Sequence, residues 1–168
     1  MNRVIMTERL RLQPMRIEDA ENVISILRHD HVKMTYMVPD LDREGAYKLF
    51  LRLKELSEND THYVRGIYLE NALIGWINDT EIQDSCVELG WVIDPLFYNH
   101  GYATEAVKAA VADLHEKGFH AVTAGAFAEN SASIRVMEKA GMQRLERQDQ
   151  IDYRGKSHLC VYYESRCE

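Results

Sequence analysis

Apolar residues recur with helical spacing in two segments near the N-terminus. In 17–29 the apolar face is formed by Ala20, Val23, Ile24 and Leu27. In 42–58 it is formed by Ala46, Leu49, Phe50 and Leu53. This period of about 3.6 residues predicts two amphipathic helices, which we expect to pack their apolar faces on a common core. The intervening stretch 31–40 is expected to be a loop.

Runs rich in branched and aromatic residues predict seven strands. We place them at 9–15, 61–69, 72–79, 86–94 and 121–127, with two more in 142–164 on either side of a turn near Arg154-Gly155. Helices are expected after the third of the middle runs, to about Lys117, and over 130–141. Two late helical crossovers predict parallel pairing, and the three middle runs predict antiparallel hairpins. The result is a mixed sheet covered by helices.

Length, composition and charge restrict the number of domains, the cellular compartment and the kinds of binding partner that we expect. A length of 168 residues with no low-complexity linker suits a single domain spanning 1–168. No segment approaches the roughly 20 apolar residues of a membrane helix, and Cys86, Cys160 and Cys167 lack metal-binding spacing. We therefore expect a cytoplasmic protein with free thiols and no membrane association. A net charge of -7 argues against nucleic-acid binding and is compatible with a cationic substrate such as an amine.

The stretch "YNHGYATEA" (98–106) separates the strand-like "CVELGWVIDP" from the helix-like "AVKAAVADL". A strand, a glycine turn and a helix N-terminus present unpaired backbone N–H groups, here those of residues 99–104. Together with the helix dipole, these groups favour a pyrophosphate, and Gly101 permits a positive φ and close backbone approach. The alternative is a strand-to-helix turn that binds no ligand.

Two motifs at a fixed separation carry a family resemblance. "WVIDPLFYNHGYATEA" and "NSASIRVMEKAGM" resemble the cofactor motifs of the GNAT superfamily of N-acetyltransferases. "TERLRLQPMRIEDAENV" and "ELGWVIDP" resemble the subgroup that contains the ribosomal-protein-alanine N-acetyltransferases. Gly101 and Ala103 fit the glycine pattern of the family, while Tyr98 stands where Gln or Arg is usual. The resemblance implies an α/β (α+β) GNAT-type fold: a mixed sheet of about seven strands, about four helices on both faces, and a splay between strands four and five.

The resemblance also implies acetyl-CoA as co-substrate and needs no metal. Backbone groups of Trp91, Val92 and Ile93 would bind the pantetheine arm, and pairing should stop at Pro95. The turn would hold the pyrophosphate through Asn99, His100, Gly101, Tyr102, Ala103 and Thr104. Asn130 corresponds to the family asparagine that binds pantetheine; its alternative role is a helix N-cap. His29, Asp30 and His31 are interpreted as solvated surface.

Two catalytic positions depart from the common family pattern. The usual thiolate acid, a tyrosine seven residues after the asparagine, is Met137 here, which leaves Ser133 as the implied acid. The glutamate that some relatives carry on strand five is Gly125 here. Glu88 is the remaining candidate base, because strand alternation puts it opposite the apolar face of Val87, Leu89 and Trp91. A structural ion pair is the alternative for Glu88, and a strand bulge could move the alignment by one residue.

The acceptor is a primary amine by resemblance, and the subgroup favours the N-terminal α-amino group of a protein or peptide. The loop 31–40 and the turn near Tyr153 would border the acceptor cleft, with Met34, Tyr36 and Tyr153 as substrate-binding residues. A small-molecule amine, such as a polyamine, an amino acid or an antibiotic, is one alternative. A non-catalytic acyl-CoA-binding protein is another, and a homodimer is compatible with each reading.

Overall fold

The computed structural model describes residues 4–168, so the first three residues of the predicted domain lie outside it. Within this range a single sheet has the order β1-β2-β3-β4-β5-β6-β8-β7. The strands are β1 (Ile5–Met6), β2 (Leu10–Gln13), β3 (Val64–Leu69), β4 (Ala72–Gln83), β5 (Cys86–Ile93), β6 (Ala121–Phe127), β7 (Gln143–Tyr153) and β8 (Lys156–Arg166). The α-helices are α1 (Ala20–Leu27), α2 (Asp30–Thr35), α3 (Arg43–Ser57), α4 (Tyr102–Glu116) and α5 (Ser131–Lys139). The predicted mixed α/β sheet is confirmed.

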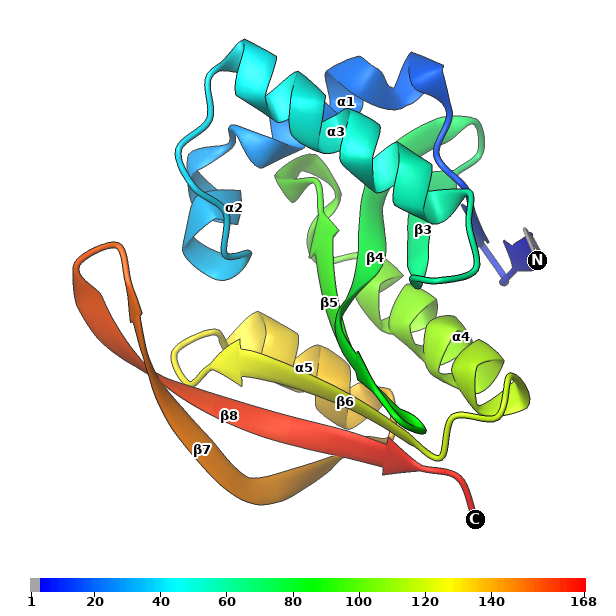
Figure 1. Cartoon of the computed structure of the whole chain (residues 1–168), viewed down its shortest axis with the longest axis vertical. Helices are drawn as coiled ribbons and strands as arrows, with labels where there is room; N and C mark the ends of the chain where they lie inside the picture. The colour runs from blue at the N-terminus through cyan, green and yellow to red at the C-terminus, as the bar shows by residue number, and fades with distance from the viewer. Residues whose placement is uncertain (1–3) are drawn as a thin grey trace.

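Helices cover both faces of the sheet, as predicted (Figure 1). On one face α1 and α3 pack their apolar residues with β3 and β4, around Phe50 and Trp76. On the other face Ala106, Val107 and Ala110 of α4 pack on Leu89 and other core residues. Each helix buries the stripe that its 3.6-residue pattern marks, because the sheet face is apolar where the helix crosses it.

Strands β5 and β6 pair in parallel over only four positions, from Cys86 with Ala121 to Leu89 with Ala124. Beyond Leu89 the two strands diverge, although β5 continues along β4 to Ile93. Asp94 then caps a 3-10 turn, Pro95–Phe97, by accepting a hydrogen bond from the Leu96 amide at 3.0 Å. The predicted splay and the stop at Pro95 are therefore confirmed.

One predicted strand pairing is wrong. The crossover through α4 does join parallel neighbours, but the crossover through α5 does not, because β8 lies between β6 and β7 and is antiparallel to both. The burial of the two strands gives the reason. Residues 160–163 of β8 are buried without interruption, whereas β7 is exposed along most of its length. The strand with two apolar faces takes the inner position, and the polar strand takes the edge.

Two elements were absent from the prediction. The stretch 31–40, expected as a loop, contains most of α2, which is stabilised by His29 accepting a hydrogen bond from the His31 amide at 3.1 Å and by full burial of Val32. The two-residue β1 pairs with β2. No helix in residues 4–168 has the length and apolar character needed to cross a membrane.

Candidate functional site

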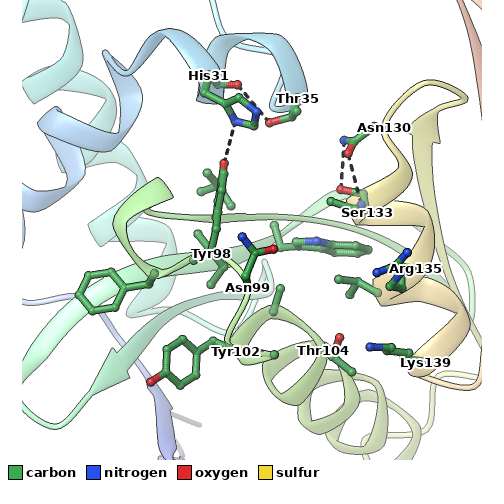
Figure 2. A pocket seen from close by; sticks show the side chains of 18 residues that line it. His31, Thr35, Tyr98, Asn99, Tyr102, Thr104, Asn130, Ser133, Arg135 and Lys139 are labelled. Atoms are coloured by element: carbon green, nitrogen blue, oxygen red, sulfur yellow. Dashed lines mark hydrogen bonds between the residues drawn. The ribbon is translucent and has the colours of Figure 1, made fainter.

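A cavity of about 520 Å³ lies where β5 leaves β6, and we call it the turn cleft. Its wall is formed by Trp91, Val92 and Ile93 of β5, by the glycine turn and by one face of α5. Figure 2 shows the turn and α5 on opposite sides of this space. Since antiparallel strands direct half of their N–H groups away from the partner, the end of β5 presents amides to the slot that β6 has vacated.

Gly101 has the left-handed conformation predicted for it, with φ 78°. It is the N-cap of α4 and makes no side-chain capping bond, so the first amides of this 15-residue helix remain open toward the cleft. Tyr102, Ala103 and Thr104 line the same space, as does Asn99, which also has a positive φ of 64°. The turn is therefore built to receive an anion through backbone groups.

Arg9, which the sequence reasoning missed, supports this turn from the β1–β2 connection. Its Nε donates to Glu105 Oε2 at 2.8 Å and its Nη1 donates to the His100 carbonyl at 2.9 Å. Glu105 Oε1 also accepts from the Arg9 amide at 2.8 Å and from Thr7 Oγ1 at 2.9 Å. Burial raises the pKa of Glu105, but these hydrogen bonds together lower it by more than burial raises it. The pKa of Glu105 therefore lies below its ordinary value. Glu105 thus ties α4 to the N-terminal hairpin.

His100 is the one proposed cofactor contact that is absent from the cleft lining. Its Nδ1 contacts the Tyr98 carbonyl at 2.7 Å, and its ring stacks on Tyr102 with centroids 5.4 Å apart. The side chain therefore serves the turn itself, and the resemblance could not reveal this because the motif fixes only backbone positions.

Asn130 and Ser133 form a closed pair at the start of α5. Asn130 caps the helix by accepting from the Ser133 amide at 3.2 Å, and its Nδ2 donates to Ser133 Oγ at 3.1 Å. The capping role is therefore present, whatever else Asn130 binds. Because Ser133 Oγ already accepts a hydrogen bond, its own hydroxyl proton is free to be donated into the cleft.

Further cleft residues escaped the sequence reasoning. Arg135 and Lys139 stand one helical turn apart on α5 and line the cleft without an ion pair among the described residues. Their i, i+4 spacing within the second motif was the available signal. His31, expected on solvated surface, also lines the cleft, and its Nδ1 lies 3.1 Å from the Tyr98 hydroxyl (Figure 2). Burial raises the pKa of Tyr98, and the Asp94 charge adds to this.

A second cavity of about 410 Å³, the Glu88 cavity, adjoins the turn cleft. It is lined by Glu88, Gly125, Phe127 and Tyr162, among others, and it shares Thr35, Trp91, Asn130 and Ser133 with the turn cleft. The two proposed catalytic residues, on β5 and α5, thus line one cavity.

Glu88 keeps the strand face predicted for it, because the irregularity that could have moved it lies on the neighbouring strand. The register of β4 shifts between Asp79 and Glu81, while Val87 and Leu89 remain buried on the opposite face of β5. Burial raises the pKa of the Glu88 carboxyl; Arg147 opposes this shift and Glu81 adds to it. No ion pair within 4.0 Å involves Glu88 in the described part of the chain, so the structural ion pair weighed above is not formed. A half-buried carboxylate that has no ion pair and a raised pKa is a better proton acceptor than an ordinary glutamate.

The proposed acceptor residues Met34, Tyr36 and Tyr153 divide between two cavities. Tyr36 lines the Glu88 cavity, where its hydroxyl donates to Asn78 Oδ1 at 3.0 Å. Met34, which is 67% exposed, and Tyr153 line a third cavity of about 480 Å³, which we call the His158 cavity. The Tyr153 hydroxyl is bound to the Lys33 and Val38 carbonyls, so Tyr153 also holds the segment after α2 in place.

Comparison with known proteins identifies this arrangement. The model of the Acetyltransferase (GNAT) domain family matches residues 9–143. The chain belongs to the GNAT acetyltransferase family. It is 31% identical over 142 residues to the "Uncharacterized N-acetyltransferase YnaD" of Bacillus subtilis, a match that covers 83% of this chain and 82% of the relative. The predicted resemblance is confirmed, and the enzyme class is that of GNAT N-acetyltransferases.

Solved structures agree on the fold. An acetyltransferase of the GNAT family from Bacillus anthracis superposes with a TM-score of 0.84 and 27% identity, over 98% of each chain. RimL, described as a ribosomal L7/L12 alpha-N-protein acetyltransferase in complex with coenzyme A, superposes with a TM-score of 0.86 and 15% identity, again over 98% of each chain. At that identity the likeness to RimL is one of fold.

Proposed function

We propose that the protein transfers the acetyl group of acetyl-CoA directly to a primary amine, the N-terminal α-amino group of a protein or peptide. The observation that carries this proposal is the wall common to two cavities: Trp91 and Ser133 line both the turn cleft and the Glu88 cavity. The thioester of a cofactor bound in the turn cleft and an amine bound in the Glu88 cavity would therefore lie next to each other, beside Trp91 and Ser133.

In this arrangement the residues that line the turn cleft bind the cofactor. The amides at the start of α4 and the side chains of Arg135 and Lys139 bind its phosphates, and the free amides near the end of β5 bind its pantetheine arm. These β5 amides also donate to the carbonyl oxygen of the thioester, which becomes an oxyanion when the amine attacks.

Glu88 and Ser133 carry the protons. Glu88 accepts a proton from the ammonium form of the acceptor, directly or through a water, and the neutral nitrogen attacks the thioester carbon. The C–S bond then breaks, and the Ser133 hydroxyl gives its proton to the departing thiolate and regains one from solvent. The attacking nitrogen, which is positively charged once its bond to carbon has formed, loses its second proton to solvent and becomes the amide nitrogen, and Glu88 releases the first proton to solvent. The Asn130 amide orients Ser133 for this role through its 3.1 Å hydrogen bond.

A peptide acceptor is favoured by two features. The Glu88 cavity is walled by apolar and aromatic side chains and opens beside Met37, which is 54% exposed, so it can admit the end of a chain whose remainder stays outside. RimL, which shares the fold, is described as an alpha-N-protein acetyltransferase.

The test is a panel of N-terminal peptides and small amines, read by acetyl incorporation and by thiol release from acetyl-CoA. We expect turnover with peptides. Activity confined to polyamines, amino acids or antibiotics would replace the peptide by a small acceptor and leave the transferase intact. Calorimetric binding of CoA without turnover on any amine would favour a non-catalytic acyl-CoA-binding protein, and no binding at millimolar CoA would overturn all three.

A further inference from the structure

The His158 cavity adjoins the Glu88 cavity and shares Thr35, Phe127 and Asn130 with it. Apart from Asn130, the transfer chemistry described above uses none of its polar side chains. It is bordered by β8, by the Tyr153–Arg154 turn and by α2, so it lies on the path of any acceptor larger than the amine itself. What its side chains can bind therefore bears on what the acceptor is.

The lining of the His158 cavity contains donor groups that have no hydrogen-bond or ion-pair partner among residues 4–168. The Lys156 ammonium makes no hydrogen bond or ion pair in residues 4–168. His158, whose side chain is 13% exposed, stacks on Phe127 with ring centroids 4.2 Å apart and pairs through Nδ1 with the Glu129 carboxylate. His31 uses its Nδ1 toward Tyr98, and the Nε2 atoms of both imidazoles are without a partner in the described structure.

The negative charges nearby are already engaged. Glu129 is the one carboxylate among the described residues that line this cavity. His158 pairs with it, and the Lys156 charge acts on it more weakly and without an ion pair. Arg154, the other lining cation, donates to Asp40 Oδ1 at 2.8 Å, and Asp40 also faces Lys33 at 3.4 Å. The free binding capacity of the His158 cavity therefore lies with Lys156 and the imidazoles, which suit an anion. The Glu88 cavity offers the opposite, an unpaired carboxylate.

We propose that the acceptor amine also carries a carboxylate, which binds Lys156 beside His158 while the amine faces Glu88. This inference rests on the proposed function and names the acceptor within it. In a peptide, the carboxylate is an Asp or Glu side chain shortly after the N-terminal residue. Complementary charges at two adjacent cavities orient the acceptor and discriminate against molecules of the reverse polarity.

The test compares three peptides that begin with Ala and continue with Glu, Gln or Lys and are otherwise identical. We expect wild-type kcat/KM to fall in that order, by about threefold to tenfold from Glu to Lys, as a partly solvated charge contact allows. Lys156→Glu should reverse the order. Lys108→Glu, at an exposed position of α4 outside all three cavities, makes the same change in net charge and should keep the wild-type order.

The outcomes separate this inference from the function on which it rests. Reversal in Lys156→Glu supports the inference, and damage to folding alone would lower all three peptides together. Transfer to peptides without a charge preference, or a Lys156→Glu protein that melts like the wild type and keeps the wild-type order, overturns the carboxylate site and leaves the transferase standing. Bound CoA with no transfer to any amine overturns the proposed function, and this inference with it.

Discussion

The ring of Tyr162 fills the space above Gly125. A Cβ atom on Gly125 would lie 2.8 Å from Cε1 and 3.0 Å from Cδ1 of this ring, closer than side chains tolerate. The Tyr162 hydroxyl donates to Asp149 Oδ2 at 2.8 Å, and the Arg147 guanidinium stacks on the ring at 3.9 Å. The Tyr162 ring thus occupies the space that a side chain at position 125 would need, and some relatives carry a glutamate at this position. In this protein the carboxylate that lines the cavity belongs to Glu88.

Gly125→Ala should destabilise the protein by about 1–3 kcal/mol, because the added methyl group meets an immobilised ring. The measurement is the free energy of unfolding in urea. Tyr162→Ala is the matched partner: in that background the methyl group has room, so Gly125→Ala should cost much less than in the wild type. Equal costs in the two backgrounds would mean that the contact with Tyr162 is not what selects glycine.

Glu88→Gln should lower kcat/KM by about a hundredfold or more, since a glutamine cannot accept the proton. In the wild type, kcat/KM should fall as the pH drops through the raised pKa of Glu88, and the variant should lack this acid limb. Glu81→Gln is a sensitive control: Glu81 raises the pKa of Glu88, so its removal should keep activity and move the limb to lower pH. An unchanged rate in Glu88→Gln would assign proton removal to solvent.

The same residue links pH to stability. Burial raises the folded-state pKa of Glu88, so the folding free energy that its protonated form contributes is present at low pH and is lost as the pH rises through that pKa. Glu88→Gln should therefore melt at or above the wild-type temperature at neutral pH, where the wild type buries a charge. A lower melting temperature at neutral pH would indicate that the carboxylate is stabilised by its surroundings.

Short-range patterns made much of this molecule predictable. The amphipathic spacing in α1 and α3, the alternation around Glu88 and the glycine turn at Gly101 are each encoded within a few consecutive residues, and the structure has them as expected. The family resemblance predicted that β5 diverges from β6, and Pro95 indicated locally where strand pairing stops.

Contacts between distant segments were not predictable in this way. Arg9 reaches the glycine turn across 91 residues, and the Tyr153 hydroxyl reaches Lys33 across 120. Nothing local to either residue signals its partner. Met137, which stands where the family resemblance expects a tyrosine, is fully buried with Ala124 and Ala126, so its side chain packs against the sheet.

Tyr153→Phe should loosen the segment after α2 without unfolding the protein. The lost hydroxyl contacts the Lys33 carbonyl and both backbone groups of Val38, and leaving these groups without it should cost about 1–2 kcal/mol. Because this segment walls the acceptor cavities, KM for the peptide should rise while CoA affinity stays constant. Hydrogen exchange of residues 33–40 reports the loosening directly, and exchange that matches the wild type would argue against the contact.

Arg9→Ala should weaken CoA binding by about threefold to tenfold, because the His100 carbonyl and the Glu105 carboxylate lose charge-assisted hydrogen bonds that fix the turn. The measurement is the Kd of CoA by calorimetry. Arg11→Ala is the matched control: Arg11 follows two residues later, in β2, and contacts the Glu70 carbonyl, away from the turn. If both variants bind CoA like the wild type, the turn keeps its shape without Arg9.

Gly101→Val should nearly abolish CoA binding, because a branched residue resists the φ of 78° that the turn adopts at this position. The turn acts through its backbone amides, so the side chains beside it should matter less. His100→Ala is the contrasting variant: its ring faces the Tyr98 carbonyl and Tyr102, outside the cleft lining, and its loss should change the Kd of CoA only slightly. Thermal melting establishes that each variant is folded before calorimetry with CoA. A folded Gly101→Val protein that binds CoA as tightly as the wild type would show that the turn connects β5 to α4 and does not hold the pyrophosphate.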